Sequence, residues 1–547
     1  MSEGLSPVSR QNSLHRMESE EFDLAIIGGG ITGAGIARDA ASRGLKVALV
    51  EGRDFASGTS SRSSKLVHGG IRYLENLEFG LVFEALSERA RLFEMAPHLV
   101  HPLRFLIPIY KGGRVPAWKM GLGMMVYDAL SLYEAPELHR YLDPGECHEE
   151  FPALRTEELS GGFVYSDAYM DDDRLVHETL RSAHRFGACI SNYTSAFHLR
   201  QEDGRVTAIE CEDARTGRAF QLRARHFVSS VGPWTDRLGS TFFKEWSRHL
   251  RPSKGVHLTF SRERFPLASA VVMAAEKRIV FAIPRHEMVI VGTTDTDFST
   301  DPSRVRCEAE DVRYLLQVVG DYFPGAKLTD KDILAAYAGV RPLIDDGAQT
   351  ESKTSREHAI WTEHGNFTFV AGGKYTTYRR MAEQTVEEVL SHFSIEDRVR
   401  YSRPQTLEAL NPLVTPELLE RAMKDCEAWL PARQRSLARA LAERHGMEGE
   451  SIVLRSSGLI PEKIKDLTER LWCMEALHAV DQTMCLHLTD FYLRRTPLVL
   501  SRADHGLPFA NAIAEVMGQR LGWSADRQRD EFNALQNQIA WDLSALG

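Results

Sequence analysis

The feature that most constrains this chain is a glycine-rich turn between an apolar strand and a helix, within residues 22–51. Residues 23–27 are a short apolar run typical of a buried parallel strand, and Gly28, Gly30 and Gly33 follow at GxGxxG spacing. The first glycine allows a tight turn, the second lets backbone N–H groups approach a pyrophosphate, and the third lets the helix pack closely on the strand.

The chain that follows completes a dinucleotide-binding unit. Residues 36–42 continue the helix, and a second apolar strand over residues 46–50 ends at Glu51, whose carboxylate can accept a ribose hydroxyl. The unit predicts a parallel α/β sheet that binds a dinucleotide. It does not decide between FAD and NAD.

Length and charge limit the remaining possibilities. The 547 residues suffice for two or three domains, and 43% hydrophobic with 26% charged residues is an ordinary globular composition. The net charge of −10 provides no global basic field, so we expect no nucleic-acid partner. An anionic substrate would therefore need a local basic pocket.

Cysteine usage and hydropathy bear on location. The seven cysteines are scattered singly, without a CxxC pair or zinc-like spacing, which predicts a reduced intracellular chain without a metal site. No run reaches the ~18 apolar residues of a spanning helix, and no signal-peptide core is seen. Residues 1–21 are rich in Ser, Glu and Arg, so we predict a disordered tail and note Met17 as an alternative start.

Two further segments have the composition of ligand-binding loops. Residues 58–65 are rich in hydroxyls that can hydrogen-bond a polar cofactor, although a solvated loop is an equal alternative. The HGGIRY sequence follows at residues 68–73, with His68 and Arg72 flanking a close backbone approach. A strand over residues 224–231 then returns the chain to the parallel sheet.

The middle of the chain predicts an antiparallel sheet and a second glycine turn. Strand-like runs cover residues 256–260, 279–283 and 288–292. A strand over residues 367–370 leads into Gly372-Gly373 and a helix, an arrangement able to stabilise negative charge on a reduced flavin, which favours FAD over NAD.

Arg341 leaves an apolar run directly before a proline. A partly buried guanidinium needs a partner, and the structural interpretation is an ion pair with Asp345 or Asp346. The functional interpretation is that it binds an anion, with Arg356 close behind.

Two helical segments are candidates for contact with a membrane or with another part of the protein. Residues 111–129 carry basic residues before a Trp-bearing amphipathic helix, which can lie on a membrane, although packing against the core is the preferred interpretation. Residues 413–547 are strongly helical and are predicted to form a separate domain, in which Arg494-Arg495 is expected on a solvated or interface face.

These blocks together carry a family resemblance. The glycine unit, HGGIRY, GVRP at residues 339–342, GGKYTTYR at residues 372–379 and LRRT at residues 493–496 resemble the FAD-dependent glycerol-3-phosphate dehydrogenases. The resemblance runs in order over residues 22–385. It implies a glutathione-reductase-type FAD-binding domain interleaved with an antiparallel β-sheet capping domain, followed by a C-terminal helical domain.

The resemblance implies a single oxidoreductase domain that covers residues 22–398. Its FAD-binding parts would cover about residues 22–75, 160–235 and 355–398, and its capping parts about residues 76–159 and 236–354. The helical domain would occupy residues 413–547. The EF-hand loops of mitochondrial relatives are missing, which favours a bacterial type.

The implied reaction is oxidation of sn-glycerol 3-phosphate to dihydroxyacetone phosphate by hydride transfer from C2 to flavin N5. His68 is the candidate base, with a loop-fixing structural histidine as the alternative. The predicted catalytic and substrate-binding residues are His68, Arg72, Tyr73, Thr294, Arg341, Arg356 and Lys374. The predicted cofactor-binding residues are Gly28, Gly30, Gly33, Glu51, Thr59, Ser60, Ser61, Ser64, Lys65, His68, Gly232, Trp234, Gly372, Gly373, Lys374 and Thr376.

The resemblance also implies partners. Members of the family are commonly dimeric peripheral membrane proteins that pass electrons to quinone, which predicts a homodimer on the inner face of the cytoplasmic membrane. The alternatives are an oxidase of the same substrate that uses oxygen, a flavin amine or amino-acid oxidase, and a non-catalytic flavin-binding module that docks on membranes.

Overall fold

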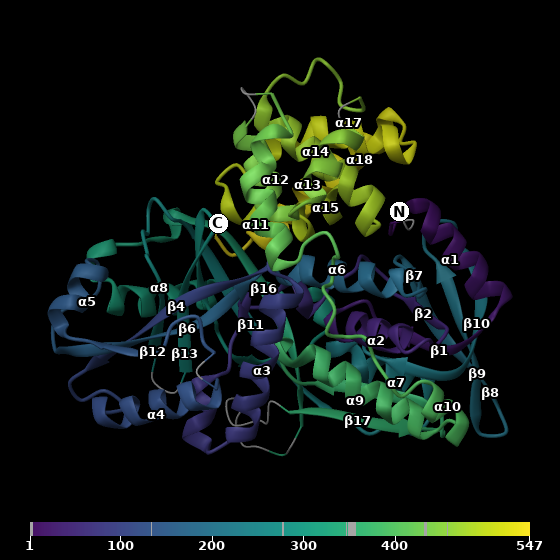
Figure 1. Cartoon of the computed structure of the whole chain (residues 1–547), viewed down its shortest axis with the longest axis horizontal. Coiled ribbons are helices and arrows are strands. Elements are labelled where there is room, and N and C mark those ends of the chain that lie inside the picture. The colour runs from purple at the N-terminus through teal and green to yellow at the C-terminus, as the bar shows by residue number, and fades with distance from the viewer. Residues whose placement is uncertain are drawn as a thin grey trace.

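The computed structural model describes residues 4–132, 134–275, 278–345, 347, 357–431, 435–456 and 458–546, without the side chains of Arg72 and Asn76. Figure 1 shows three parts: a parallel sheet with its helices, a second sheet beside it, and a helical part that lies over both. The predicted combination of an α/β dinucleotide fold, an antiparallel capping sheet and a C-terminal helical region is confirmed.

The first sheet has the order β17-β18-β10-β1-β2-β7, with β9 paired to β10 and β8 to β9. Its strands from β18 to β7 run parallel, and the others are antiparallel. The strands are β1 (Glu21–Ile27), β2 (Val47–Val50), β7 (Cys189–Ser191), β8 (Thr194–Glu202), β9 (Arg205–Asp213), β10 (Arg218–Ser229), β17 (His358–Glu363) and β18 (Phe367–Gly372).

Three helices pack against one another and against the central strands of this sheet. They are α2 (Ile31–Ser42), α6 (Asp172–Arg185) and α9 (Tyr378–Ser391). Strands β1 and β2 are buried along nearly their whole length, because both faces of a parallel sheet are covered. Short elements at the edges of this part are η1 (Thr59–Ser61), η3 (Gly232–Trp234), α7 (Thr235–Phe242), η8 (Tyr375–Thr377) and α10 (Ile395–Arg400).

The second sheet has ten strands in the order β15-β11-β14-β13-β12-β4-β6-β3, with β16 on β11 and β5 on β6. All pairs are antiparallel except β12 with β4. The strands are β3 (Leu66–Val67), β4 (Val100–Tyr110), β5 (Arg140–Leu142), β6 (Leu159–Met170), β11 (Leu250–Ser261), β12 (Ala270–Ala275), β13 (Arg278–Arg285), β14 (Met288–Gly292), β15 (Thr296–Asp297) and β16 (Ile333–Ile344). Its helices are η2 (Ile71–Asn76), α3 (Phe79–Met95), α4 (Ala117–Leu130), α5 (Pro144–Glu150) and α8 (Ala309–Tyr322).

The C-terminal part is helical and has its own apolar core. Its helices are α11 (Pro416–Asp425), α12 (Arg435–His445), α13 (Glu448–Ser456), α14 (Leu467–Thr483), α15 (Leu488–Arg494), α16 (Leu498–Ser501), α17 (Ala510–Leu521) and α18 (Ala525–Asp542). Among the residues that the structure describes, no helix combines the length and the apolar character needed to cross a bilayer.

The predicted disordered tail is wrong, because the N-terminal segment contains α1 (Pro7–Ser19), packed on β7 and β10. Ser6 caps this helix in a reciprocal pair of bonds with Ser9. Arg10 is fully buried, donates to the Asn192 carbonyl oxygen at 2.8 and 3.0 Å, and pairs with Asp213 at 2.6 Å. Low apolar content misled the prediction, since long-range ionic contacts order this helix.

Candidate active site

The glycine turn joins β1 to α2 in the predicted conformation. Gly28 has a φ of +110°, and its N–H donates to the Val50 carbonyl oxygen at 2.9 Å. A Cβ atom on Gly33 would lie 2.0 Å from the Gly28 carbonyl oxygen. Gly33 therefore permits the close helix packing that brings the first N–H groups of α2 to the turn.

Glu51 ends the second strand and faces the same turn. Its Oε2 accepts a hydrogen bond from Gly29 N–H at 2.7 Å, and its Oε1 accepts one from Arg53 N–H at 2.9 Å. Burial raises the pKa of the Glu51 carboxyl and outweighs the two backbone hydrogen bonds, which by themselves would lower it. The carboxylate is thus fixed beside the glycine turn, where a ribose would have to lie.

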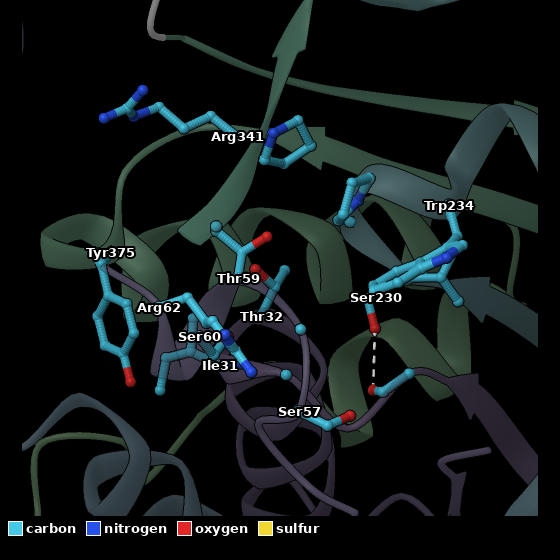
Figure 2. Close-up of a pocket in the computed structure, with 18 of the residues that line it drawn as sticks. Ile31, Thr32, Ser57, Thr59, Ser60, Arg62, Ser230, Trp234, Arg341 and Tyr375 are labelled. Atoms are coloured by element: carbon cyan, nitrogen blue, oxygen red, sulfur yellow. Dashed lines mark hydrogen bonds between the residues drawn. The ribbon is translucent and has the colours of Figure 1, made fainter. Parts of the chain in front are cut away.

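A cavity of about 860 Å³ extends from Glu51 between the two sheets to the second glycine turn. In Figure 2, Ser57, Thr59 and Ser60 line the cavity beside α2. Trp234 lies on the right of the view, and Arg341 and Tyr375 lie on the left. Most predicted ligand-binding residues contribute to this wall: Gly28, Gly30, Glu51, Thr59, Ser60, Ser64, His68, Tyr73, Gly232, Trp234, Arg341, Gly372, Gly373, Lys374 and Thr376.

The remaining predicted residues lie elsewhere. Gly33, Ser61, Lys65 and Thr294 are not among the described residues that line the cavity. Arg356 lies outside the described residues. The backbone of Arg72 belongs to η2, but its side chain is outside the described part.

Internal partners explain two of these exceptions. The Lys65 ammonium is buried in an ion pair with Asp172, so it fixes the loop instead of pointing at a cofactor. The Thr294 hydroxyl oxygen accepts a hydrogen bond from Val256 N–H at 3.0 Å. Lys65 and Thr294 were predicted to bind ligands, but their side chains are engaged in contacts within the protein.

Arg341 is held by groups from neighbouring strands. Its guanidinium donates to Asp295 Oδ1 at 3.1 Å and to Thr293 Oγ1 at 2.9 Å. The carboxylate that accepts this bond belongs to Asp295 and not to Asp345, one of the two predicted partners; the other, Asp346, lies outside the described residues. Pairing of β16 with β11, and of β11 with β14, brings the VGTTD segment (residues 291–295) to Arg341, which sequence proximity did not reveal.

The flavin-facing end of such a cavity would lie between η2 and η8, which meet at HGGIRY and GGKYTTYR. His68 N–H donates to Thr376 Oγ1 at 3.3 Å. The Lys374 ammonium lies 3.6 Å from the centre of the Tyr73 ring. The two motifs, some 300 residues apart in the chain, thus form one surface.

His257 is a cavity residue that the sequence did not single out. It is buried on β11, with Nε2 2.8 Å from Ser64 Oγ and its ring stacked on Tyr337 at 4.7 Å. Burial, Arg341 and Lys65 lower its pKa well below the usual range, so the imidazole is neutral. The available signal was a histidine inside the strand-like run over residues 256–260.

Comparison with known proteins assigns the family. The family model described as FAD dependent oxidoreductase matches residues 23–379, and one described as the C-terminal domain of alpha-glycerophosphate oxidase matches residues 376–528. The chain is 35% identical to the aerobic glycerol-3-phosphate dehydrogenase of Bacillus subtilis, covering 99% of each. It is 33% identical to that of Staphylococcus saprophyticus, covering 99% of this chain and 98% of that protein. The chain belongs to the aerobic glycerol-3-phosphate dehydrogenase family.

Structural comparison agrees with this membership. The glycerol-3-phosphate dehydrogenase of Bacillus halodurans, solved in complex with FAD, superposes with a TM-score of 0.79 at 30% identity and 99% coverage of both chains. Glycine oxidase of Geobacillus kaustophilus superposes with a TM-score of 0.52 at 20% identity, over 72% of this chain and 99% of that one, and shares the fold alone.

The cavity of this glycerol-3-phosphate dehydrogenase family member fits FAD, the cofactor of the family. A Cβ atom on Gly30 would lie 3.1 Å from Ser60 Oγ, a contact tight enough to require a small shift of the Ser60 side chain. At the opposite end, Gly372 and Gly373 have φ values of +79° and +78°, which L side chains rarely adopt. Exposed backbone at both ends of one cavity suits a long dinucleotide.

Proposed function

We propose that this chain oxidises sn-glycerol 3-phosphate at C2 to dihydroxyacetone phosphate, with bound FAD as the hydride acceptor. One observation carries the proposal: Arg341 and Lys374 contribute cations to a dinucleotide cavity that also contains His68 and neutral His257. In a chain of net charge −10, this local excess of cations favours an anionic substrate.

The proposed binding of FAD assigns its adenosine end to Glu51 and its pyrophosphate to the N-terminus of α2. Oriented N–H groups and the helix dipole favour the phosphates there. Thr59, Ser60 and Ser64 would hydrogen-bond the middle of the cofactor, and Gly232 and Trp234 would cover it. Gly372, Gly373 and Thr376 would hold the flavin, where FAD supplies hydride acceptance at N5.

The phosphate of the substrate is assigned to Arg341. Its guanidinium is one-fifth exposed and oriented by Ser253, Thr293 and Asp295, so less freedom is lost when the fork binds phosphate oxygens. Lys374 is assigned to the reacting end, where its ammonium stabilises negative charge developing on the C2 oxygen. Arg72, Tyr73 and Arg356 complete the proposed substrate site, and Thr294 contributes through its carbonyl oxygen, which already orients Arg341.

Loss of the C2 hydroxyl proton needs a base at the cavity. His68 is the proposed base, since its loop lies against Thr376 at the second glycine turn. His257 is the second candidate because it lies in the cavity beside Ser64; the burial and the cations that keep its ring neutral also make it a weaker base. A positioned base contributes roughly 10²- to 10⁴-fold to the rate.

Anaerobic addition of glycerol 3-phosphate to the purified flavoprotein tests the reaction directly. Bleaching of the flavin band supports the proposal, whereas an unchanged band, with glycine and D-amino acids also inactive, would leave a non-catalytic flavin-binding module. Stopped-flow reduction of His68→Gln and His257→Gln separates the two bases. The variant that loses about 10²-fold or more in reduction rate identifies the base, and wild-type rates in both would exclude each of them.

We also propose that the electrons pass to quinone at a membrane surface. The α4 face, defined here as the exposed apolar side chains of α4, of the adjoining η2–α3 turn and of the first turns of α3, supports membrane contact: Leu77, Phe79, Phe83, Trp118, Leu122 and Met125. Figure 1 places α4 on the side of the molecule away from the helical part. The preferred expectation that this helix packs its apolar side on the core is wrong for Trp118, Leu122 and Met125, which are 74%, 56% and 60% exposed.

The proposed acceptor, location and assembly have separate tests. Quinone reduction without stoichiometric peroxide supports the dehydrogenase, and peroxide in equal yield would instead support the oxygen-using oxidase. Flotation with liposomes tests attachment to the inner face of the cytoplasmic membrane, and recovery wholly in the soluble fraction at low and high salt would contradict it. A light-scattering mass of one chain in detergent would contradict the proposed homodimer.

A further inference from the structure

A buried ionic cluster joins the helical part to the loop that follows Glu51. Asp54, three residues further on, is 1% exposed and accepts hydrogen bonds from Arg494 Nε at 2.5 Å and Arg495 Nη2 at 2.9 Å. Burial alone would raise the pKa of Asp54, but the two arginines outweigh it and hold the pKa below its usual range. Both arginines were expected on a solvated or interface face; they are 9% and 7% exposed and pair with Asp54 across the junction, so the interface alternative is confirmed and the solvated one is wrong.

Asn192 connects this cluster to a second segment of the cavity wall. Its Nδ2 donates to Asp54 Oδ1 at 3.4 Å and to the Met484 carbonyl oxygen at 3.0 Å. Two residues further on, Thr194 N–H donates to the Glu51 carbonyl oxygen at 2.7 Å. Thr194 lines the cavity at the end where Glu51 lies.

The N-terminal segment reaches the same place from the opposite direction. Arg10 of α1 donates to the Asn192 carbonyl oxygen and to Thr194 Oγ1, the latter at 3.4 Å. Met484 N–H donates to the Leu5 carbonyl oxygen at 2.6 Å, so this segment also contacts the helical part. Two regions at opposite ends of the chain therefore meet behind the adenosine end of the cavity.

We infer that Arg10, Asp54, Asn192, Arg494 and Arg495, here called the adenosine brace, set how tightly the protein retains FAD. None of the five is assigned a contact with the cofactor; they are positioning residues. They fix residues 51–54 and 192–195 before FAD binds, so that little ordering entropy remains to oppose binding. Without the brace, both segments would have to be ordered by the cofactor itself, and FAD would dissociate faster.

The test is FAD release from the holoenzyme, followed by flavin fluorescence after dilution. Asp54→Asn removes the charge that both arginines share, and we expect FAD to dissociate at least tenfold faster. At saturating FAD, the kcat and the KM for glycerol 3-phosphate should match the wild type, because the substrate end is untouched. A release rate equal to that of the wild type would overturn the inference.

A matched control separates the brace from general loosening of the helical part. Glu448→Gln weakens another buried ion pair across the same junction, where Arg181 of α6 binds Glu448 at 2.6 Å. We expect this variant to release FAD at the wild-type rate. Equal acceleration in Asp54→Asn and Glu448→Gln would overturn the inference, since the effect would then come from domain docking.

A milder variant tests the same inference if Asp54→Asn does not fold. Tyr193→Phe removes only the hydroxyl that donates to Asp490 Oδ1 at 2.6 Å, and the same oxygen accepts a hydrogen bond from the brace residue Arg494 at 2.9 Å. FAD release at least threefold faster would support the brace, and a wild-type rate would overturn it. Because flavin is measured directly, this result stands whether or not glycerol 3-phosphate is the substrate.

Discussion

Replacement of Arg341 by alanine tests the proposed phosphate site most sharply. Truncating one partner of a buried, hydrogen-bonded charge pair costs about 2–5 kcal/mol. The guanidinium of Arg341 is 21% exposed and already pairs with Asp295, so screening and that pairing reduce the value. We therefore expect a loss of about 2–3 kcal/mol, or roughly 30- to 150-fold at about 1.4 kcal/mol per tenfold.

The assay compares glycerol 3-phosphate with glycerol. In the wild type, the ratio of the two kcat/KM values measures what the phosphate contributes to transition-state binding. Arg341→Ala should lower this ratio by the predicted factor while changing turnover of glycerol little. Arg341→Lys should fall between, because it keeps the charge but loses the planar fork.

A neighbouring arginine provides the control. Arg251 lies on β11, pairs with Asp297 at 2.9 Å, and is not among the described residues of the cavity wall. Arg251→Ala should leave the substrate ratio unchanged. The assignment would be refuted if Arg341→Ala kept the wild-type ratio within twofold, or if Arg251→Ala lowered it equally.

Three other predictions follow from local geometry. Gly33→Ala should yield protein without bound flavin, because the new Cβ would lie 2.0 Å from the Gly28 carbonyl oxygen; a normal flavin-to-protein absorbance ratio would contradict this. Burial, with His392 nearby, lowers the pKa of His226 to about 3 in the folded protein. Between about pH 3 and pH 6.5 the imidazole is therefore protonated in the unfolded chain but not in the folded one. This contribution to stability is complete above pH 6.5 and falls by about 2 kcal/mol at pH 5, so the Tm of His226→Gln should decline less than that of the wild type between pH 7 and 5. Parallel declines would contradict it. Finally, Trp118→Ser with Leu122→Ser should reduce liposome partitioning at least tenfold without changing flavin reduction in solution, since each exposed side chain contributes about 1.5–3 kcal/mol when buried in lipid; unchanged flotation would exclude the α4 face.

Local sequence determined the cofactor-binding elements. The strand, glycine turn, helix and second strand over residues 22–51 form as predicted, since Gly28 and Gly33 are required by contacts within the unit or with the adjoining strand end at Ser230. HGGIRY and GGKYTTYR were likewise recognisable, and the structure brings His68 to Thr376. Short-range constraints of this kind are visible because a turn type limits which residue can occupy it.

Tertiary structure decided which charged side chains face the ligand and which are used by the fold. Lys65 and Arg341 are both cations near predicted loops, yet Lys65 is buried against Asp172 whereas Arg341 reaches the cavity. His257 reaches the cavity through strand register, and Arg10 is buried by partners some 180 to 200 residues away. A buried charge is stable only where distant partners neutralise it, and those partners are chosen by strand pairing and domain docking that no local pattern records.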